Sequence, residues 1–205
     1  MSQMAVAEHP TGSSEYEPGF YGTSWQKLMM WWFIIGDAIL FGSLLAAYGF
    51  NRMAVGDWPD IMKVFGNLNL ITVMTFTLIT SSATMATAVA ASRRGDHKAA
   101  FRFTLATAIG GAAFLGMQAY EWTHLIHAGA RLSGNPWGAP AFGAFFFTIT
   151  GFHGSHVASG VLILLYTAWN AGRGKSGPEG VELAGLYWHF VDLVWVFVFG
   201  TFYLL

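Results

Sequence analysis

The sequence predicts an all-α integral membrane protein that folds as a bundle of five transmembrane helices. Of its 205 residues, 54% are hydrophobic and only 10% are charged, and the mean hydropathy is +0.46. Soluble domains carry about 25% charged residues. Five segments reach the roughly 20 apolar residues that a helix needs to cross a bilayer. Histidines and carboxylates inside them recur three residues apart, which is the spacing of one helix face.

The five segments follow one another with polar connections between them. They comprise residues 28–50, 68–91, 99–124, 140–169 and 182–205. The first begins with Trp31 and Trp32, an aromatic pair typical of the membrane interface. The fourth, at 30 residues, is longer than the bilayer requires and is expected to tilt or protrude. The third contains Gly110, Gly111 and Gly116, which suit close approach between helices.

Residues 1–24 are polar and are predicted to form a flexible tail before a single domain, residues 25–205. The tail lacks the basic start and apolar centre of a signal peptide. The absence of cysteine excludes disulfides, thiolate zinc sites and iron–sulfur clusters. A net charge of −1 gives no indication of nucleic-acid binding.

Basic residues predict the orientation in the membrane. One side of the expected topology carries seven lysines and arginines, and the other side carries three. The two sets are Lys27, Arg93, Arg94, Lys98, Arg102, Arg173 and Lys175 against Arg52, Lys63 and Arg131. Because basic connections favour the cytoplasm, we expect the N-terminus to be cytoplasmic and the C-terminus to be periplasmic.

Two segments place ionisable side chains at membrane depth. His189 and Asp192 stand three residues apart in the fifth segment, and His153 and His156 do so in the fourth. An ionisable residue at the bilayer centre costs about 2.5–3.5 kcal/mol on insertion scales. These side chains are therefore expected to face another helix or water.

Asp37 lies in the first segment, about 13 Å from its expected cytoplasmic edge at 1.5 Å per residue. Two interpretations are open. The carboxylate either bonds to a neighbouring helix or acts as a functional acid that handles protons or faces lipid. Gln118, Glu121 and His124 end the third segment. Glu121 and His124 match the Glu-x-x-His element of di-iron bundles, although we favour a polar helix end near the outer interface.

The ionisable side chains are numerous enough to ligate a metal ion: Glu121, His124, His153, His156, His189 and Asp192. Their expected depths spread them apart, from about 10 Å at His189 through about 20 Å at His156 to about 30 Å at Glu121. Ligands of one ion lie within about 4–5 Å of one another. A hydrogen-bonded network between helices fits better. The depths pair Asp192 with His156, and Glu121 with His153.

These motifs resemble those of subunit III of the heme-copper terminal oxidases. Stretches 151–157 and 187–195 are similar almost letter for letter to two C-terminal motifs of that family. Residues 118–122 resemble its glutamine-alanine-x-glutamate-aromatic motif. Residues 33–48 are similar to the helix that bears the family's intramembrane carboxylate, and Asp37 falls on it where many members have glutamate. The resemblance covers all but the tail, whereas mitochondrial-type members have seven helices.

The resemblance implies an accessory subunit of a proton-pumping cytochrome c oxidase that reduces oxygen to water in aerobic electron transport. Such a subunit has no catalytic residue and binds no heme, copper or other metal. It packs against the heme-bearing subunit I, with subunit II in the same complex, in the bacterial inner membrane. It stabilises subunit I and holds phospholipids in a cleft between helices.

The resemblance also implies roles for particular residues. Asp37 corresponds to a carboxylate near the lipid cleft and the path of proton uptake. A family arginine near the cytoplasmic end of the fourth segment meets a lipid phosphate, and Arg173 is the nearest arginine here. The remaining polar side chains are expected to form a structural network: Glu121, His153, His156, His189 and Asp192.

Two other functions stay open. A subunit III-like component of a quinol oxidase or a nitric oxide reductase carries the same motifs. An alternative of another class is a membrane di-iron or zinc oxidoreductase that uses Glu121, His124, His153, His156 and His189. That enzyme requires a second Glu-x-x-His element and ligands at one depth, and the sequence offers neither.

Overall fold

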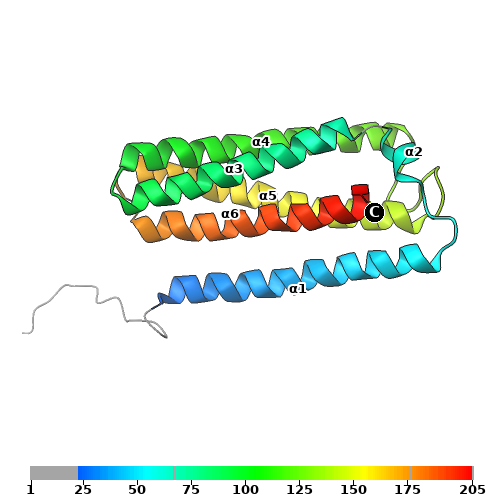
Figure 1. Cartoon of the computed structure of the whole chain (residues 1–205), viewed down its shortest axis with the longest axis horizontal. Coiled ribbons are helices and arrows are strands. Elements are labelled where there is room, and N and C mark those ends of the chain that lie inside the picture. The colour runs from blue at the N-terminus through cyan, green and yellow to red at the C-terminus, as the bar shows by residue number, and fades with distance from the viewer. Residues whose placement is uncertain (1–22, 67, 176, 205) are drawn as a thin grey trace, which may run out of the picture.

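The computed structural model describes residues 23–66, 68–175 and 177–204, and within them five long helices form an antiparallel bundle (Figure 1). In chain order these are α1 (Trp25–Ala54), α3 (Asn69–Arg93), α4 (His97–His127), α5 (Ala141–Gly172) and α6 (Pro178–Phe199). All five are long and apolar enough to cross a membrane, α6 together with the π-helix Gly200–Leu204 that follows it. The prediction of an all-α protein with five spans is confirmed for the described residues, and the chain is a multi-pass membrane protein.

The helices extend beyond the predicted segments at one or both ends, and polar side chains cap the starts of α1 and α4. Ser24 caps α1, and its hydroxyl accepts a hydrogen bond from the backbone N–H of Lys27. A short helix, α2 (Ile61–Phe65), lies in the connection after α1 and is capped in the same way by Asp60. The predicted tail lies outside the described residues up to residue 22.

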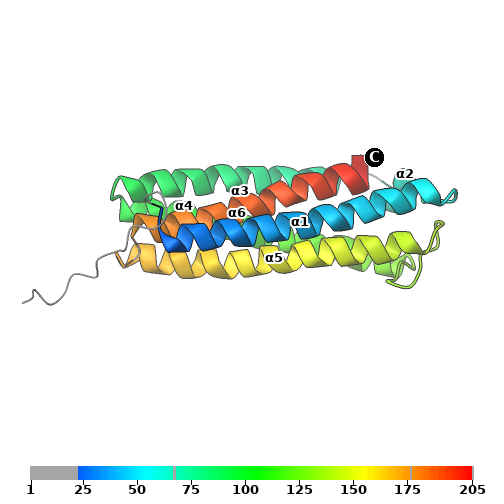
Figure 2. The same cartoon turned by 90° about the horizontal axis from the view of Figure 1, so that it is seen from below.

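The helices form layers that can be followed in two views (Figures 1 and 2). α3 and α4 pack together, α5 and α6 pack beneath them, and α1 lies against α5 and α6 from the other side. Phe41 and Tyr48 are the buried residues of α1. Most of the surface of α1 therefore faces outward, and its attachment depends on a few contacts.

The core between α3, α4 and α6 is built around two tryptophans. Trp188 and Trp195 of α6 are buried almost completely. The indole N–H of Trp188 donates to Oγ of Ser81 at 3.0 Å, and that of Trp195 donates to Oγ1 of Thr75 at 3.0 Å. The space for Trp188 comes from Gly111, where a Cβ atom would lie 2.3 Å from the indole ring. The close approach predicted for this part of α4 is confirmed at Gly111.

A cluster of charges joins three helices at one end of the bundle. Oε1 of Glu182 lies 2.9 Å from Nζ of Lys27 and 3.0 Å from a guanidinium nitrogen of Arg93. This carboxylate oxygen links α6 to α1 and α3. Because successive long helices run in opposite directions, the start of α1 and the end of α6 lie at opposite ends of the bundle (Figure 1).

Candidate functional site

A buried contact between Asp37 and His156 links α1 to α5. Oδ2 of Asp37 lies 2.7 Å from Nε2 of His156, and the two side chains are 11% and 12% exposed. The rings of Phe41 and Phe152 pack edge-on against the imidazole, with centroids 5.6 and 4.6 Å away. The structure thus gives Asp37 a partner on a neighbouring helix, as the first of the two interpretations expected.

The two ring nitrogens of His156 have different surroundings, because Nδ1 faces its own helix and Nε2 faces Asp37. Nδ1 of His156 lies 2.9 Å from the carbonyl oxygen of Phe152, and because a carbonyl only accepts, Nδ1 carries a hydrogen. The approach of Nε2 to Oδ2 falls short of regular hydrogen-bond geometry. The two atoms nevertheless lie within ion-pair distance, at 2.7 Å.

Next to this pair, α5 and α6 meet through Ser159 and Tyr187. The two hydroxyl oxygens are 2.7 Å apart, and they lie 2.9 and 3.2 Å from the carbonyl oxygen of His156. Both residues border a cavity of about 610 Å³ between α1, α5 and α6. Met30 and Phe33 of α1 give this cavity an apolar wall.

Arg173, the second residue implicated in lipid binding by the resemblance, lies elsewhere. It directly follows α5 and is exposed, with its guanidinium 4.1 Å from the ring centroid of Trp169. The length of α5 between His156 and Arg173 is about 25 Å. The structure does not bring Arg173 to Asp37.

A second polar group surrounds Glu121 near the other end of the bundle. The hydroxyl of Tyr203 lies 3.0 Å from both carboxylate oxygens, and the amide of Gln118 donates to Oε2 at 3.0 Å. Glu121 is only 5% exposed. The predicted pairing of Glu121 with His153 is wrong, because Tyr203 of the terminal π-helix occupies the position beside the carboxylate.

A third polar group lies between α3 and α6. Nδ1 of His189 is 2.6 Å from Oγ of Ser82, and Ser82 is also a hydrogen-bond partner of Asp192. The spacing of three residues does place His189 and Asp192 on one face of α6, but that face meets α3. The predicted pairing of Asp192 with His156 is wrong, because His156 faces α1.

His153 lies apart from these three groups, among aromatic rings. It is fully buried, stacked on Trp195 at 5.4 Å and edge-on to Phe114 at 5.8 Å between centroids. Neither ring nitrogen has a hydrogen-bond partner in the part of the chain that the structure describes. A step of three residues is about 60° short of a full helical turn, and this difference directs His153 to the core and His156 to α1. The predicted polar network thus falls into separate local groups.

The arrangement also bears on the metal alternative. Among the described residues, no three histidine or acidic side chains gather as a metal site requires. Glu121 is bonded to Tyr203 and Gln118, and His156 is in contact with Asp37. The ligand set proposed for a di-iron or zinc oxidoreductase is therefore not assembled in this structure.

Sequence reasoning missed the hydroxyl groups that complete these sites: Ser82, Ser159, Tyr187 and Tyr203. Hydroxyls in membrane helices often bond their own backbone, as Thr72 and Thr77 do here. The residue type therefore does not indicate which hydroxyl reaches another helix. For Tyr187 and Ser159 the available signal is their position within a few residues of the histidine motifs.

The fold and these sites define a class of protein, a multi-pass helical membrane protein with carboxylates inside its spans. Asp37, Glu121 and Asp192 each contact a polar group on another helix. The family model of cytochrome c oxidase subunit III matches residues 20–205. The chain belongs to the cytochrome c oxidase subunit III family.

Relatives in this family include subunits of oxidases with different electron donors. Quinol oxidase subunit 3 of Bacillus subtilis (strain 168) is 34% identical over 207 residues, covering 98% of each chain. Cytochrome c oxidase subunit 3 of Bacillus sp. (strain PS3) is 35% identical over 181 residues, covering 87% of this chain and 84% of the relative. Cytochrome bo(3) ubiquinol oxidase subunit 3 of Pseudomonas aeruginosa is 33% identical over 178 residues, covering 85% and 82%.

Proposed function

We propose that this chain is a non-catalytic accessory subunit of a proton-pumping heme-copper oxidase in the bacterial inner membrane. It stabilises the heme-bearing subunit I, with subunit II in the same complex, and holds phospholipid in a cleft between helices. Electron transfer and oxygen reduction take place in those partner subunits, which carry the heme and copper. Membership of the subunit III family supports the assignment to an oxidase complex.

The contact between Asp37 and His156 is the observation that carries the specific role. It fixes α1 against α5 beside the apolar cavity of about 610 Å³. The neighbouring surface of α1 is also apolar, with Met29 and Trp32 more than half exposed. An acyl chain would occupy this apolar cavity, and the contact between Asp37 and His156 helps to hold its α1 wall in place.

The proposed orientation places the start of α1 in the cytoplasm and the end of α6 in the periplasm. The connections α3–α4 and α5–α6 lie at the same end of the bundle as the start of α1 (Figure 1). That end carries the basic residues Lys27, Arg93 and Lys98, which supports a cytoplasmic location. In this orientation the Asp37 region belongs to the cytoplasmic half of the membrane, where proton uptake begins.

Purification through an affinity tag placed after residue 205 tests the proposal. We expect the tagged chain to bring heme-containing and copper-containing subunits with it in a complex that consumes oxygen. The chain stripped from these partners is expected to hold no stoichiometric iron, zinc or copper. A lone active enzyme, or a metal bound to the separated chain, would overturn the proposed function.

A quinol oxidase is the second candidate for the complex. The Bacillus subtilis relative named quinol oxidase subunit 3 matches this chain over 98% of both lengths. The electron donor binds other subunits, so this chain has the same accessory role in either complex. Oxygen consumption by the purified complex with reduced cytochrome c and with a quinol separates the two candidates.

A further inference from the structure

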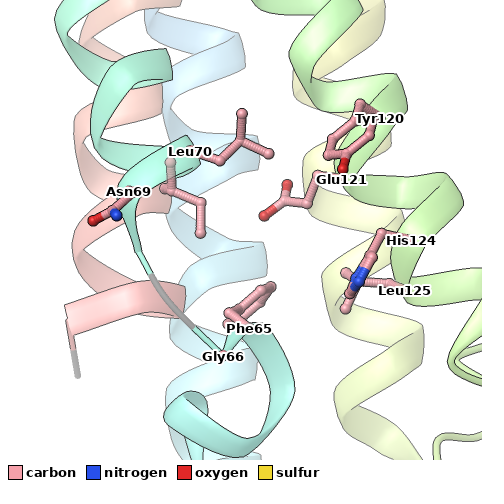
Figure 3. Close-up of a pocket in the computed structure, with 9 residues that line it drawn as sticks. Phe65, Gly66, Asn69, Leu70, Tyr120, Glu121, His124 and Leu125 are labelled. Atoms are coloured by element: carbon pink, nitrogen blue, oxygen red, sulfur yellow. The ribbon is translucent and has the colours of Figure 1, made fainter.

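A cavity of about 570 Å³ opens between α3 and α4 near the end of the bundle opposite the Asp37 region (Figure 3). Its lining includes Phe65, Leu70, Ile71, Glu121, His124 and Leu125. The Glu121 carboxylate points into the space between the two helices, and His124 stands one helical turn further along α4 (Figure 3). The cavity thus combines apolar walls with one buried acid, in the last turns of a membrane-spanning helix.

The polar group around Glu121 has more acceptors than protein donors. The Tyr203 hydroxyl has one hydrogen, although its oxygen lies 3.0 Å from both carboxylate oxygens. Gln118 supplies one further bond through its amide nitrogen. The amide oxygen of Gln118 is itself buried without a donor among the described residues. No lysine or arginine is among the residues described as lining the cavity. A ligand that complements this group supplies N–H donors and positive charge.

A second, separate cavity lies along the same seam, nearer the middle of the helices. It has a volume of about 530 Å³, and its lining includes Val73, Phe76, Thr77, Ala106, Ile109 and Gly110. Asn69 of the first cavity and Val73 of the second share one face of α3, about 6 Å apart along the helix, whereas Tyr120 and Gly110 on α4 are about 15 Å apart. The hydroxyl of Thr77 is bonded to the carbonyl of Val73 at 2.8 Å. Thr77 therefore brings no unmet hydrogen-bond donor to this groove.

The two cavities offer separate places for the head group and for an acyl chain of one lipid. From Ile71 to Thr84 their α3 lining extends for about 20 Å, which exceeds the roughly 15 Å of hydrocarbon in one leaflet. The acid lies at the end of the seam near the helix termini, where lipid head groups are found. A head group at Glu121 would direct its acyl chain into the groove.

We propose that the α3/α4 seam binds a phospholipid whose head group carries a primary ammonium. The ammonium supplies three N–H donors and a positive charge to the Glu121 carboxylate. An anionic head group without an amine would bring more acceptors to a group that already has a surplus. His124, exposed at the outer edge, is placed on the side where the phosphate would lie. This site lies on the other side of the α5/α6 layer from Asp37. The proposal rests on the proposed function in one respect, because it is tested in the assembled oxidase complex.

Lipid exchange on the purified complex tests the proposal. The complex is equilibrated in detergent with equal amounts of dioleoyl phosphatidylethanolamine and dioleoyl phosphatidylglycerol, and the lipid retained on this subunit is counted by native mass spectrometry. Because charge-assisted hydrogen bonds are worth about 1.5–3 kcal/mol, we expect roughly tenfold or greater preference for the ethanolamine lipid. Glu121→Gln is expected to remove the preference. Asp57→Asn, which changes an exposed carboxylate at the same end, is expected to retain it.

A second variant changes the groove and leaves Glu121 intact. Ala106 is exposed and lines the groove, so Ala106→Phe is expected to fill it and to lower retention of both lipids in an assembled complex. This variant keeps the test valid if Glu121→Gln fails to assemble. Equal retention of the two lipids by the unmodified complex, or an unchanged preference in Glu121→Gln, would overturn the proposal.

Cross-linking identifies what occupies the seam. The chain contains no cysteine, so Ala106→Cys takes a photoreactive label at a single position. A lipid adduct supports the proposal, whereas an adduct to another polypeptide means that a partner covers the seam and overturns it. Heme measured in the same preparation separates the two hypotheses. A heme-containing complex without lipid preference contradicts only the lipid site, and a preparation without heme contradicts the proposed function.

Discussion

Oδ2 of Asp37 lies 2.7 Å from Nε2 of His156, and this contact joins the most exposed helix of the bundle to its interior. Phe41, one turn further along α1, is 3% exposed and covers the imidazole from the same side. Polar contacts at the start of α1 add to it, because Lys27 pairs with Glu182 and Ser24 donates a hydrogen bond to Glu179. The position of α1 thus depends on an acid–imidazole contact near its middle and on polar contacts at its start.

We expect Asp37→Asn to be mild. The asparagine amide can donate to Nε2 of His156, so the contact survives although the carboxylate is lost. Heme content and the initial rate of oxygen consumption should remain close to those of the unmodified complex. The loss should appear as faster inactivation during turnover, followed by continuous oxygen measurement, or as changed lipid retention. Asp37→Leu, which cannot donate, is the comparison and should inactivate sooner. Immediate loss of activity in an assembled Asp37→Asn complex would contradict the proposed accessory role.

The Asp37–His156 contact should appear as coupling in a double-mutant cycle. Asp37→Ala and His156→Ala each remove the contact, so the double variant should cost less than the sum of the two. Polar contacts between membrane helices average about 0.6 kcal/mol and reach about 1.7 kcal/mol, and we expect a value in that range. The measurement is the denaturant concentration at which the subunit leaves the complex. His156 paired instead with Asp192→Ala is the control, since those residues belong to separate groups and their effects should add.

The positions of the functional side chains were predictable from the sequence, but their partners were not. Spacing alone indicated that His189 and Asp192 share a face, and both reach Ser82. Expected depths separated Asp37 and His156 by about 7 Å, although their atoms are in contact. The count from each helix end failed because those ends are not level: α1 starts further into the bundle than the neighbouring helices end (Figure 1). Tyr203 was missed because a π-helix directs it inward.

The ion pairs of Glu182 should contribute a small, salt-dependent part of the stability. Glu182→Gln removes the negative charge that pairs with both Lys27 and Arg93 and leaves a neutral amide oxygen in its place. These side chains are partly exposed, so we expect a loss of about 0.5–1 kcal/mol at low ionic strength and a smaller one in high salt. The same denaturation measurement at two salt concentrations checks this. A loss that does not change with salt would mean that Glu182 acts through packing.

The orientation predicts where reporters fused to the chain will function. A periplasmic reporter placed after residue 205 should be active, because five spans carry the C-terminus across the membrane from a cytoplasmic start. A reporter inserted within residues 92–98, the α3–α4 connection, should behave as cytoplasmic. The expression level of each fusion protein is measured together with its reporter activity and serves as the control. The opposite pattern would reverse the orientation and place Asp37 in the outer half of the membrane.

Two glycines of α4 allow packing to be separated from helix propensity. Alanine stabilises a helix by about 0.8–1.0 kcal/mol relative to glycine. At Gly116 an added Cβ meets nothing within 4 Å, so Gly116→Ala should be neutral or stabilising. At Gly111 the same atom would lie 2.3 Å from Trp188 and 2.8 Å from Val161. Overpacking a core typically costs about 1–3 kcal/mol, which exceeds the gain in propensity.

We therefore expect Gly111→Ala to lower the stability of the subunit and Gly116→Ala to leave it unchanged or raise it. The displaced Trp188 would also lose its hydrogen bond to Ser81. Thermal dissociation of the subunit, together with the tryptophan emission maximum, measures both effects. If the two variants behaved alike, the close contact between α4 and the Trp188 indole would not exist in the membrane, because propensity alone treats the two positions equally.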